Sequence, residues 1–236
     1  MPVRSRVLAA AAVTAAVVGA GTGTTLPASA ATPACGPDCI AVPSPEFGTH
    51  GDPRFVEAVL DGMVTVGQPL VLHRASSSDP SEDFVPRGGL VSDFAAAGMV
   101  SAAVDGHYGS LRAAQLEYAP SGVASGLCVG LAGTAYEDQP LGLQPCSVPG
   151  TTVWIVDTAD SPATATAGYS PLVNGSTTDF THPFAMTYPA DASPTDEPAP
   201  QIHVSRLRSC GDADTDERVV PGRQLWGTVL GVLDQG

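Results

Sequence analysis

The stretch 126–157, GLCVGLAGTAYEDQPLGLQPCSVPGTTVWIVD, decides the fold because another part of the chain repeats its centre. Its QPLGL segment at 139–143 is matched by QPLVL at 68–72. An aromatic residue follows each segment at a similar distance, Trp154 in one case and Phe84 in the other. Internal similarity of this kind indicates a fold built from stacked or packed units, none of which buries its apolar side alone.

A third, weaker copy of the segment is HPFAM at 182–186. Short apolar runs precede the three copies, namely CIAV at 39–42, CVGL at 128–131 and LV at 172–173. Each run has the length and composition of a buried strand. The sequence therefore predicts three related units that share one core.

Composition points to strands and to a chain that avoids polyanions. With 22 prolines and 26 glycines, there is little material for long helices. The formal net charge is −14, and such a surface repels phosphate backbones and anionic lipid. Nucleic acid and membranes are therefore excluded as expected partners.

The N-terminal 30 residues have the pattern of a secretory signal peptide. Arg4 and Arg6 form a basic start, an apolar run covers 7–20, and Ala28, Ser29 and Ala30 form a small-residue cleavage site. The run is too short to span a bilayer. We expect cleavage near Ala30, export of the chain, and one domain covering 31–236.

Five cysteines would then lie in a compartment where disulfides persist. Cys128 and Cys146 flank the QPLGL segment, and a bridge between them would stabilise the chain by roughly 3 kcal/mol. Cys35 and Cys39 are predicted to pair across a Gly-Pro turn, although their spacing also admits a redox or metal site. Cys210 is left as a free thiol, an intermolecular bridge, or a sign of different pairing.

Short β-rich runs separated by turn-forming residues predict an all-β barrel or sandwich. The expected strands lie at 64–66, 70–72, 90–94, 141–143, 153–156, 184–187, 202–204 and 225–230. Two stretches, 54–60 and 94–104, are left open between helix and strand. Polar or proline-rich segments at 75–82, 158–168, 189–200 and 210–221 are expected to be surface loops.

The order of cysteine strand, second cysteine and tryptophan resembles the ricin-type β-trefoil unit, with its C-[LI]-D-V, V-x-L-x-x-C and Q-x-W elements. The middle repeat matches best through CVGL, LGLQPC at 141–146 and TVW at 152–154. The first repeat ends in EDF at 82–84, and the third has two candidate ends, QIH at 201–203 and QLW at 224–226. The resemblance implies three pseudo-repeats, with six strands in a barrel, six strands capping one end, and a shallow sugar pocket in each repeat.

Departures from that pattern bear on function. Where the family has an aspartate that receives sugar hydroxyls, Ala41 and Gly130 stand here, and Thr152 replaces the Gln of Q-x-W. The packing residues survive, so a retained fold with lost sugar sites is expected. The remaining ligand-binding candidates are Tyr136, Glu137 and Asp138, which place an aromatic ring beside two acceptors. We therefore predict that these three residues form one candidate site.

No catalytic motif is present in the sequence: G-x-S-x-G, H-E-x-x-H and a phosphate-binding glycine loop are all missing. The acidic run at 212–216 has the opening spacing of a calcium loop, but Glu217 stands where its glycine should be. No catalytic residue, metal or cofactor is therefore predicted. We expect a secreted, monomeric, non-enzymatic protein that binds a glycan. The alternatives are a protein-binding module, such as a trefoil protease inhibitor acting through the 189–200 loop, and a hydrolase with an unfamiliar site.

Overall fold

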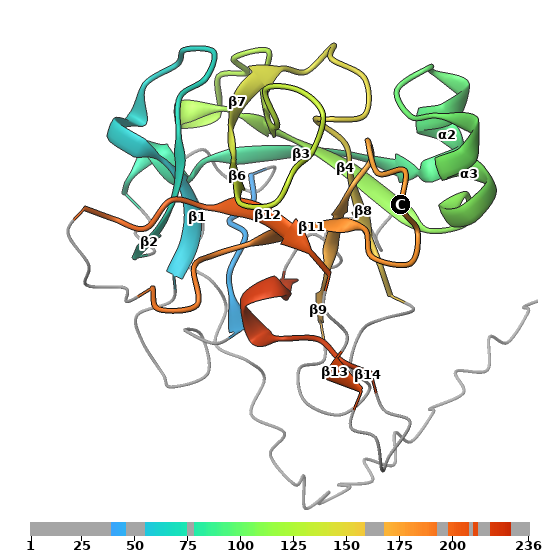
Figure 1. The fold of residues 1–236 in the computed structure, drawn as a ribbon. Coiled ribbons are helices and arrows are strands. Elements are labelled where there is room, and N and C mark those ends of the chain that lie inside the picture. Colours follow the sequence, from blue (N-terminus) through green and yellow to red (C-terminus); the bar gives the residue numbers. More distant parts are fainter. Residues whose placement is uncertain are drawn as a thin grey trace, which may run out of the picture.

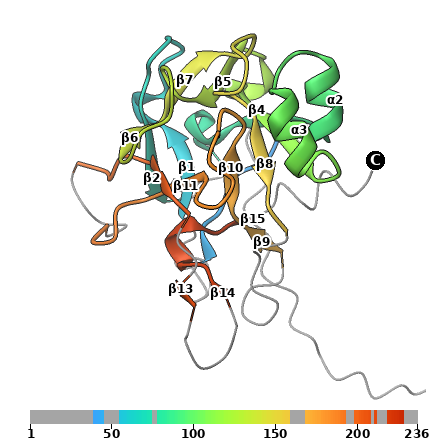
Figure 2. The ribbon, with the colours of Figure 1, turned by 45° about the vertical axis from the view of Figure 1, so that its right-hand side comes forward.

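The computed structural model describes residues 39–45, 55–74, 78–158, 168–192, 198–207, 210–211 and 218–227, which form a short β-barrel with a pair of helices beside it (Figures 1 and 2). Its longer strands are β1 (Phe55–Val59), β2 (Leu70–Arg74), β3 (Phe84–Leu90), β4 (Arg112–Tyr118), β5 (Leu127–Gly130), β7 (Gly142–Pro145), β11 (Phe184–Thr187) and β12 (His203–Arg206). The shorter strands are β6 (Gln139–Pro140), β8 (Trp154–Val156), β9 (Tyr169–Ser170), β10 (Leu172–Asn174), β13 (Cys210–Gly211), β14 (Arg218–Val219) and β15 (Trp226–Gly227). The two α-helices are α2 (Val91–Ala96) and α3 (Ala102–Tyr108).

One pairing recurs three times and defines three repeats. In each repeat the last strand carries an aromatic residue that lies opposite a residue of the first strand. The pairs are Phe84 with Ile40, Trp154 with Ala114, and Trp226 with Ser170. We name the repeats by their described residues: the first covers 39–90, the second 112–156 and the third 168–227.

The last strand of each repeat also joins it to the next repeat. Phe84 lies opposite Tyr118, Trp154 lies opposite Asn174, and the backbone N–H of Gly227 donates to the carbonyl of Pro43 at 2.9 Å. The third link returns to the first repeat. Among the described residues, the bridged segment 39–45 and the strands β3, β4, β8, β9–β10 and β15 therefore follow one another around a ring, as in a barrel of six strands.

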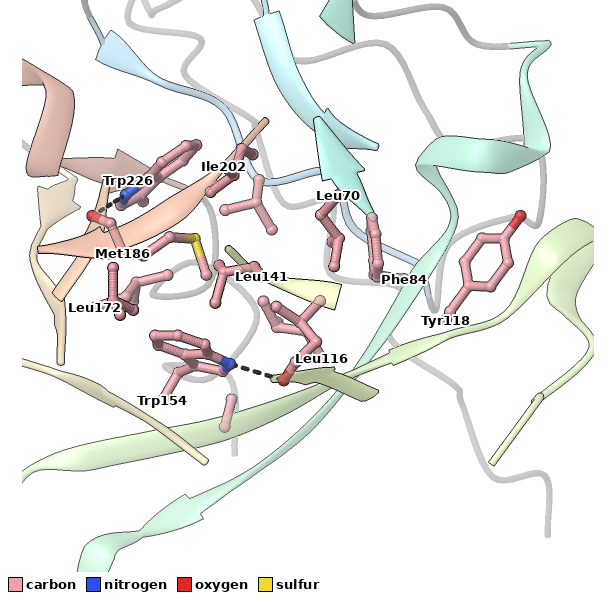
Figure 3. Close-up of a cluster of buried hydrophobic side chains, with 14 of the residues drawn as sticks. Leu70, Phe84, Leu116, Tyr118, Leu141, Trp154, Leu172, Met186, Ile202 and Trp226 are labelled. Carbon is pink, nitrogen blue, oxygen red and sulfur yellow. Dashed lines mark hydrogen bonds between the residues drawn. The ribbon is translucent and has the colours of Figure 1, made fainter. Parts of the chain in front are cut away.

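The third strands of the repeats meet at one end of the barrel around a pseudo-three-fold axis. Backbone N–H groups donate in a cycle, from Leu70 to the carbonyl of Leu141 at 3.2 Å, from Leu141 to that of Ile202 at 2.9 Å, and from Ile202 to that of Leu70 at 2.9 Å. These three residues occupy equivalent positions and their side chains point into the core (Figure 3). A closed six-stranded barrel capped on a three-fold axis is a β-trefoil, as predicted.

The repeated QPL segments were correctly identified in the first two repeats, since Leu70 and Leu141 both lie on the axis. The third copy predicted at 182–186 is wrong, because that segment enters β11, the second strand of its repeat. Ile202 takes the axial position instead. Of the two candidate ends for the third repeat, 224–226 is therefore the equivalent of 152–154, and 201–203 belongs to the axial strand.

The predicted alignment of the opening runs also changes. Residues 39–42 lie in the first strand of their repeat, whereas Cys128 and Val129 lie in β5, a second strand. The second strands of the three repeats are β1, β5 and β11. Their pairing with the third strands places three residues at equivalent positions: Glu57 opposite Leu72, Val129 opposite Leu143, and Met186 opposite Val204. The runs at 39–42 and 128–131 thus resemble each other without being structurally equivalent.

Both tryptophans fill the barrel and use their polar atoms in the same way. The Nε1–H of Trp154 donates to the carbonyl of Val129 at 3.0 Å, and that of Trp226 donates to the carbonyl of Met186 at 2.9 Å (Figure 3). Each ring is nearly fully buried. A buried indole with its donor satisfied combines large apolar area with a fixed orientation.

The first repeat departs from this pattern at its core. Glu57 occupies the position of Val129 and Met186, is fully buried, and neither carboxylate oxygen has a hydrogen-bond partner in the structure. Burial raises the pKa of Glu57 to about 8. The side chain is therefore protonated at neutral pH, because a neutral acid costs far less to bury than a carboxylate.

Helices α2 and α3 lie against the outside of the sheet, next to β4 and β8 (Figure 2). Val91, Val104 and Tyr108 pack there with Ile155 and Val173 in a second apolar cluster.

The predicted strand at 90–94 is wrong, since β3 ends at Leu90 and α2 begins at Val91. Of the two open assignments, the described part of 54–60 is the strand β1 followed by the start of a 3₁₀ turn, and 94–104 contains parts of two helices joined by a turn. Neither described helix has the length and apolar character required to cross a bilayer.

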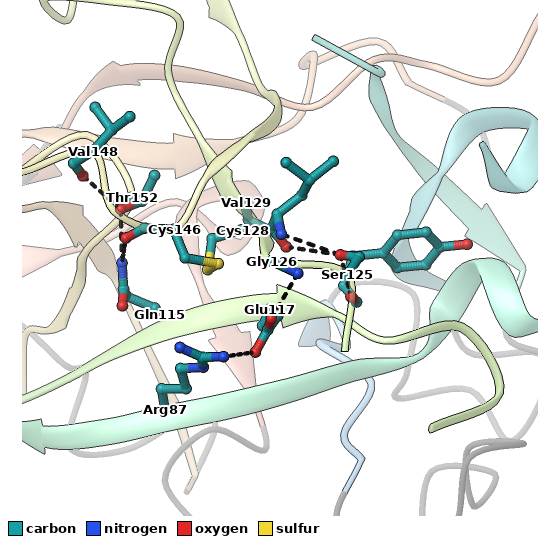
Figure 4. Close-up of a disulfide and its surroundings, with 12 residues drawn as sticks. Arg87, Gln115, Glu117, Ser125, Gly126, Cys128, Val129, Cys146, Val148 and Thr152 are labelled. Carbon is teal, nitrogen blue, oxygen red and sulfur yellow. Dashed lines mark hydrogen bonds and ion pairs between the residues drawn. A yellow bond between two sulfur atoms is a disulfide. The ribbon is translucent and has the colours of Figure 1, made fainter. Parts of the chain in front are cut away.

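The disulfide predicted within the second repeat is present and joins β5 to the end of the β7 hairpin arm (Figure 4). The sulfurs of Cys128 and Cys146 are 2.01 Å apart and their Cα atoms 4.9 Å apart. Beside it, the amide of Gln115 donates to the carbonyl of Cys146 at 2.6 Å and to the hydroxyl of Thr152 at 2.8 Å. Cys39 is also disulfide-bonded, while its predicted partner Cys35 lies outside the described residues.

One further strand prediction is wrong, and two pairs of strands were not predicted. Residues 64–66 form an exposed turn before β2 instead of a strand, with Val64 and Val66 about half exposed. The longest pairing, between β3 and β4, was not predicted, because glycines, a proline and alanines give those strands a weak β signal. Within the predicted 210–221 loop, β13 and β14 pair as a short ladder. The acidic run at 212–216 lies outside the described residues.

Candidate functional site

A pocket of about 580 Å³ opens on the third repeat, in the size range of small-molecule sites. Its lining is predominantly polar and comes from four parts of the chain. The lining residues are Glu137, Asp138, Thr187, Pro189, Ala190, His203, Ser205 and Arg223. Two of the three predicted ligand-binding residues, Glu137 and Asp138, are among them.

The back of the pocket is the polar face of the hairpin formed by β11 and β12. Thr187 lies opposite His203 in the antiparallel register, and Met186 lies opposite Val204. Because side chains alternate along a strand, Met186 and Val204 point into the barrel core while Thr187, His203 and Ser205 point to the pocket. The hairpin therefore serves the core on one face and the pocket on the other.

The buried side chain of Gln224 fixes this polar face through hydrogen bonds. Its side-chain amide donates to the hydroxyl of Thr187 at 3.1 Å, to the hydroxyl of Ser205 at 3.0 Å and to the carbonyl of Arg206 at 3.1 Å. The two hydroxyls are also 3.1 Å apart. Gln224 is almost fully buried, so the network is shielded from water and holds both hydroxyls in fixed positions.

The predicted candidates 136–138 form a turn that leads into β6. A carboxylate oxygen of Glu137 accepts from the backbone N–H of Arg206 at 3.0 Å, which ties the turn to β12. Asp138 has a φ of +59°, a conformation that Asp and Asn tolerate better than most residues. Tyr136 is 58% exposed and precedes the turn, but it is not one of the residues that line the pocket.

His203 and Asp138 face each other across the pocket wall, with Nε2 and Oδ1 3.5 Å apart. Burial lowers the pKa of His203, although the Asp138 carboxylate acts in the opposite direction. The imidazole is therefore neutral at pH 7, with one ring nitrogen able to donate and the other able to accept. The Asp138 side chain is 78% exposed and thus accessible to a ligand.

Together these groups offer acceptors and donors without a concentrated charge. Two carboxylates and an imidazole can accept hydrogen bonds, and the Arg223 guanidinium can donate. The Thr187 hydroxyl already donates to the carbonyl of Ala185 at 3.0 Å, so its oxygen faces the pocket as an acceptor. The Ser205 hydroxyl is already engaged by Gln224 and Thr187, which is a poor arrangement for a nucleophile. The pocket suits a neutral ligand rich in hydroxyl groups.

The second repeat closes the equivalent position. Gly130 pairs with Gly142 as Thr187 pairs with His203, and Ala58 is the equivalent in the first repeat. A Cβ on Gly130 would lie 2.9 Å from both the carbonyl oxygen of Thr151 and a methyl of Thr152. Ala58, Gly130 and Thr187 are therefore the equivalent residues of the three repeats, and the predicted correspondence of Ala41 with Gly130 is wrong. Only the third repeat retains a polar side chain there.

Sequence reasoning missed most of the pocket. His203, Ser205 and Arg223 come from strands and turns far from 136–138, and the barrel closure brings them together. The available signal was the alternation of polar and apolar residues in 201–205, which places a polar face opposite the core. The sequence predicted a strand at 202–204 and a possible repeat end at 201–203, but it did not assign the polar face of that strand to a binding site.

Comparison with known proteins supports the fold. The crystal structure of ThreeFoil, a designed three-fold symmetric protein, superimposes with a TM-score of 0.50, covering 81% of this chain and 97% of that chain at 13% sequence identity. The shared architecture is the β-trefoil. No family model and no curated protein matches the chain. At this identity the likeness concerns fold alone, so function depends on the site.

Proposed function

We propose that this is a secreted, non-enzymatic binding protein whose third-repeat pocket takes a neutral glycan. The observation that carries the proposal is the pocket itself, where Asp138, His203 and Arg223 surround a preorganised pair of hydroxyls. Carboxylate and imidazole acceptors match sugar hydroxyls, and preorganisation lowers the entropic cost of binding. Tyr136 precedes the lining residue Glu137 in the sequence, and its exposed ring adds a surface on which a sugar ring can stack.

Three further observations support the proposal. The trefoil fold suits a binding module, the disulfide between Cys128 and Cys146 suits an oxidising compartment, and the N-terminal pattern predicts export. The resemblance to ricin-type lectins favours glycans over other hydroxyl-rich ligands. The open Thr187 position agrees with this, since the other two repeats carry Ala58 and Gly130 there.

The test is a glycan array and polysaccharide pull-down with oxidised protein, followed by calorimetry on any hit. Asp138→Asn removes the carboxylate charge while keeping a residue that tolerates positive φ. We expect it to weaken binding at least tenfold, because a charge-assisted hydrogen bond to the ligand is lost. His203→Ala is expected to have a similar effect, and Tyr136→Ala a smaller one.

The first repeat offers a matched control. Asp61 has the same φ of +59° in an exposed turn, so Asp61→Asn makes the same chemical change in the same backbone conformation. It should leave glycan binding unchanged. Equal loss in Asp61→Asn and Asp138→Asn, or binding that survives both Asp138→Asn and His203→Ala, would assign the ligand to another surface.

A further inference from the structure

Three metal-ligating side chains converge on the first repeat, away from the pocket of the third. They are His73 in β2, Asp79, and Glu82 in the 3₁₀ turn η2 (Pro80–Glu82). One ligand atom from each lies within 4.8 Å of the other two. His73 lies near the end of β2, and Asp79 and Glu82 lie between β2 and β3, so all three candidate ligands come from neighbouring parts of the sequence.

The local backbone fixes the two carboxylates. Asp79 caps η2, with Oδ1 accepting from the backbone N–H of Ser81 at 2.9 Å, and Pro80 holds the first position of the turn. Glu82 ends the turn, and its side chain is only 5% exposed. The neighbouring Asp83 is directed elsewhere, because its Oδ2 accepts from the N–H of Ser121 at 2.8 Å. The turn thus orders Asp79 and Glu82 on one side.

The imidazole of His73 supplies an independent sign of a missing ligand. Its Nδ1 is buried and has no hydrogen-bond partner, although the residue as a whole is partly exposed. Nδ1 lies 3.6 Å from Oε1 of Glu82, too far for a good hydrogen bond. Two ligands at about 2.0–2.1 Å from one tetrahedral metal would be separated by a little over 3 Å, so a small contraction would seat an ion between them.

The donor types select the class of ion. One imidazole nitrogen and two carboxylate oxygens fit Zn²⁺ and its first-row neighbours, whereas Ca²⁺ and Mg²⁺ prefer oxygen donors alone. We propose that His73, Asp79 and Glu82 form a Zn²⁺ site with a fourth coordination position open to water or to an external ligand. This site is independent of the proposed glycan pocket, since the two share no residue.

The experiment is a titration of the chelator-treated full chain with Zn²⁺ by calorimetry and with Co²⁺ by visible absorption, which reports coordination geometry directly. We expect one ion per chain, with d–d bands of a four-coordinate site. His73→Ala and Glu82→Gln should each weaken binding at least tenfold. Circular dichroism and urea unfolding verify that each variant is folded.

His203→Ala is the matched control, because His203 also faces a carboxylate, that of Asp138 at 3.5 Å, and belongs to the other site. It should bind Zn²⁺ as the parent protein does. Parent protein that binds Zn²⁺ no more tightly than His73→Ala would overturn the proposal, and so would loss of binding in His203→Ala alone. In either case the 3.6 Å contact of His73 with Glu82 is a side-chain contact without a metal-binding role.

Discussion

The first and third repeats share one framework but treat their buried polar groups in opposite ways. In the third repeat Met186 fills the barrel, Trp226 donates to its carbonyl, and Gln224 satisfies the polar face behind it. In the first repeat the equivalents are Glu57, Phe84 and Glu82. An acid thus replaces an apolar residue, and a ring without a donor replaces an indole.

This difference distinguishes the residues that all three repeats share from the polar layer that only one repeat has. The barrel closes in both repeats, and the axial cycle of Leu70, Leu141 and Ile202 is complete. An apolar axial position and an aromatic residue in the fourth strand are the features that all three repeats share. The hydrogen-bonded polar layer of the third repeat goes beyond that requirement, and it lies where the pocket is. Exchanging equivalent residues between the repeats tests this interpretation.

The largest effect is expected from Glu57→Met, which gives the first repeat the residue of the third. Because the native pKa is about 8 and the ordinary value is 4.5, the unfolded state releases this proton at lower pH than the native state. The free energy of unfolding is therefore not reduced by Glu57 ionisation below about pH 4.5. It falls by about 1.4 kcal/mol per pH unit as the pH rises from about 4.5 to about 8. Glu57→Met removes this loss.

Urea unfolding of both proteins at pH 5 and pH 8 measures the effect. We expect Glu57→Met to exceed the parent by about 4 kcal/mol at pH 8 and by clearly less at pH 5. Glu57→Gln, which has nearly the same shape and does not ionise, should lose the pH dependence while keeping a buried polar group. An equal difference at the two pH values would show that Glu57 is not protonated in the native state.

The second exchange, Gln224→Glu, gives the third repeat the residue of the first. The new carboxylate cannot donate to Thr187, Ser205 and the carbonyl of Arg206, so buried acceptors lose their donor. We expect a loss of about 3 kcal/mol in the free energy of unfolding. Any glycan affinity should fall as well, because the hydroxyls of the pocket are no longer fixed.

Gln115→Glu in the second repeat makes the same change in a similar network, since its amide donates to Cys146 and Thr152. It should lower stability to a comparable degree and leave the pocket intact. If Gln115→Glu reduced glycan binding as much as Gln224→Glu, the loss would reflect general destabilisation and not the order of the pocket.

The same comparison explains which features of the fold could be predicted from the sequence. The repeated QPL segments, the tryptophan of the second repeat and the bridge between Cys128 and Cys146 are local signals, and they predicted the trefoil. The register of the third repeat was missed because Ile202 and Trp226 are separated by an insertion that holds β13 and β14. Spacing therefore did not reveal the equivalence.

The sites were harder to predict for a different reason. Glu137 and Asp138 were found because an aromatic and two acids are adjacent in sequence, but His203 and Arg223 join them only through the packing of two repeats. His73, Asp79 and Glu82 lie close in sequence at a spacing without a familiar metal motif. Their convergence depends on the η2 turn, which composition alone does not predict.

The smallest effect is expected from Trp226→Phe, which gives the third repeat the ring type of Phe84. The change removes the hydrogen bond from Nε1 to the carbonyl of Met186 and leaves space where the larger ring packed. We expect a loss of about 2 kcal/mol in the free energy of unfolding, from one unpaired buried carbonyl plus a small cavity. Trp154→Phe breaks the equivalent bond to Val129 and should cost a similar amount. Unchanged stability in both variants would mean that the indole donors are dispensable, and that the first repeat with Phe84 is no weaker than the others at this position.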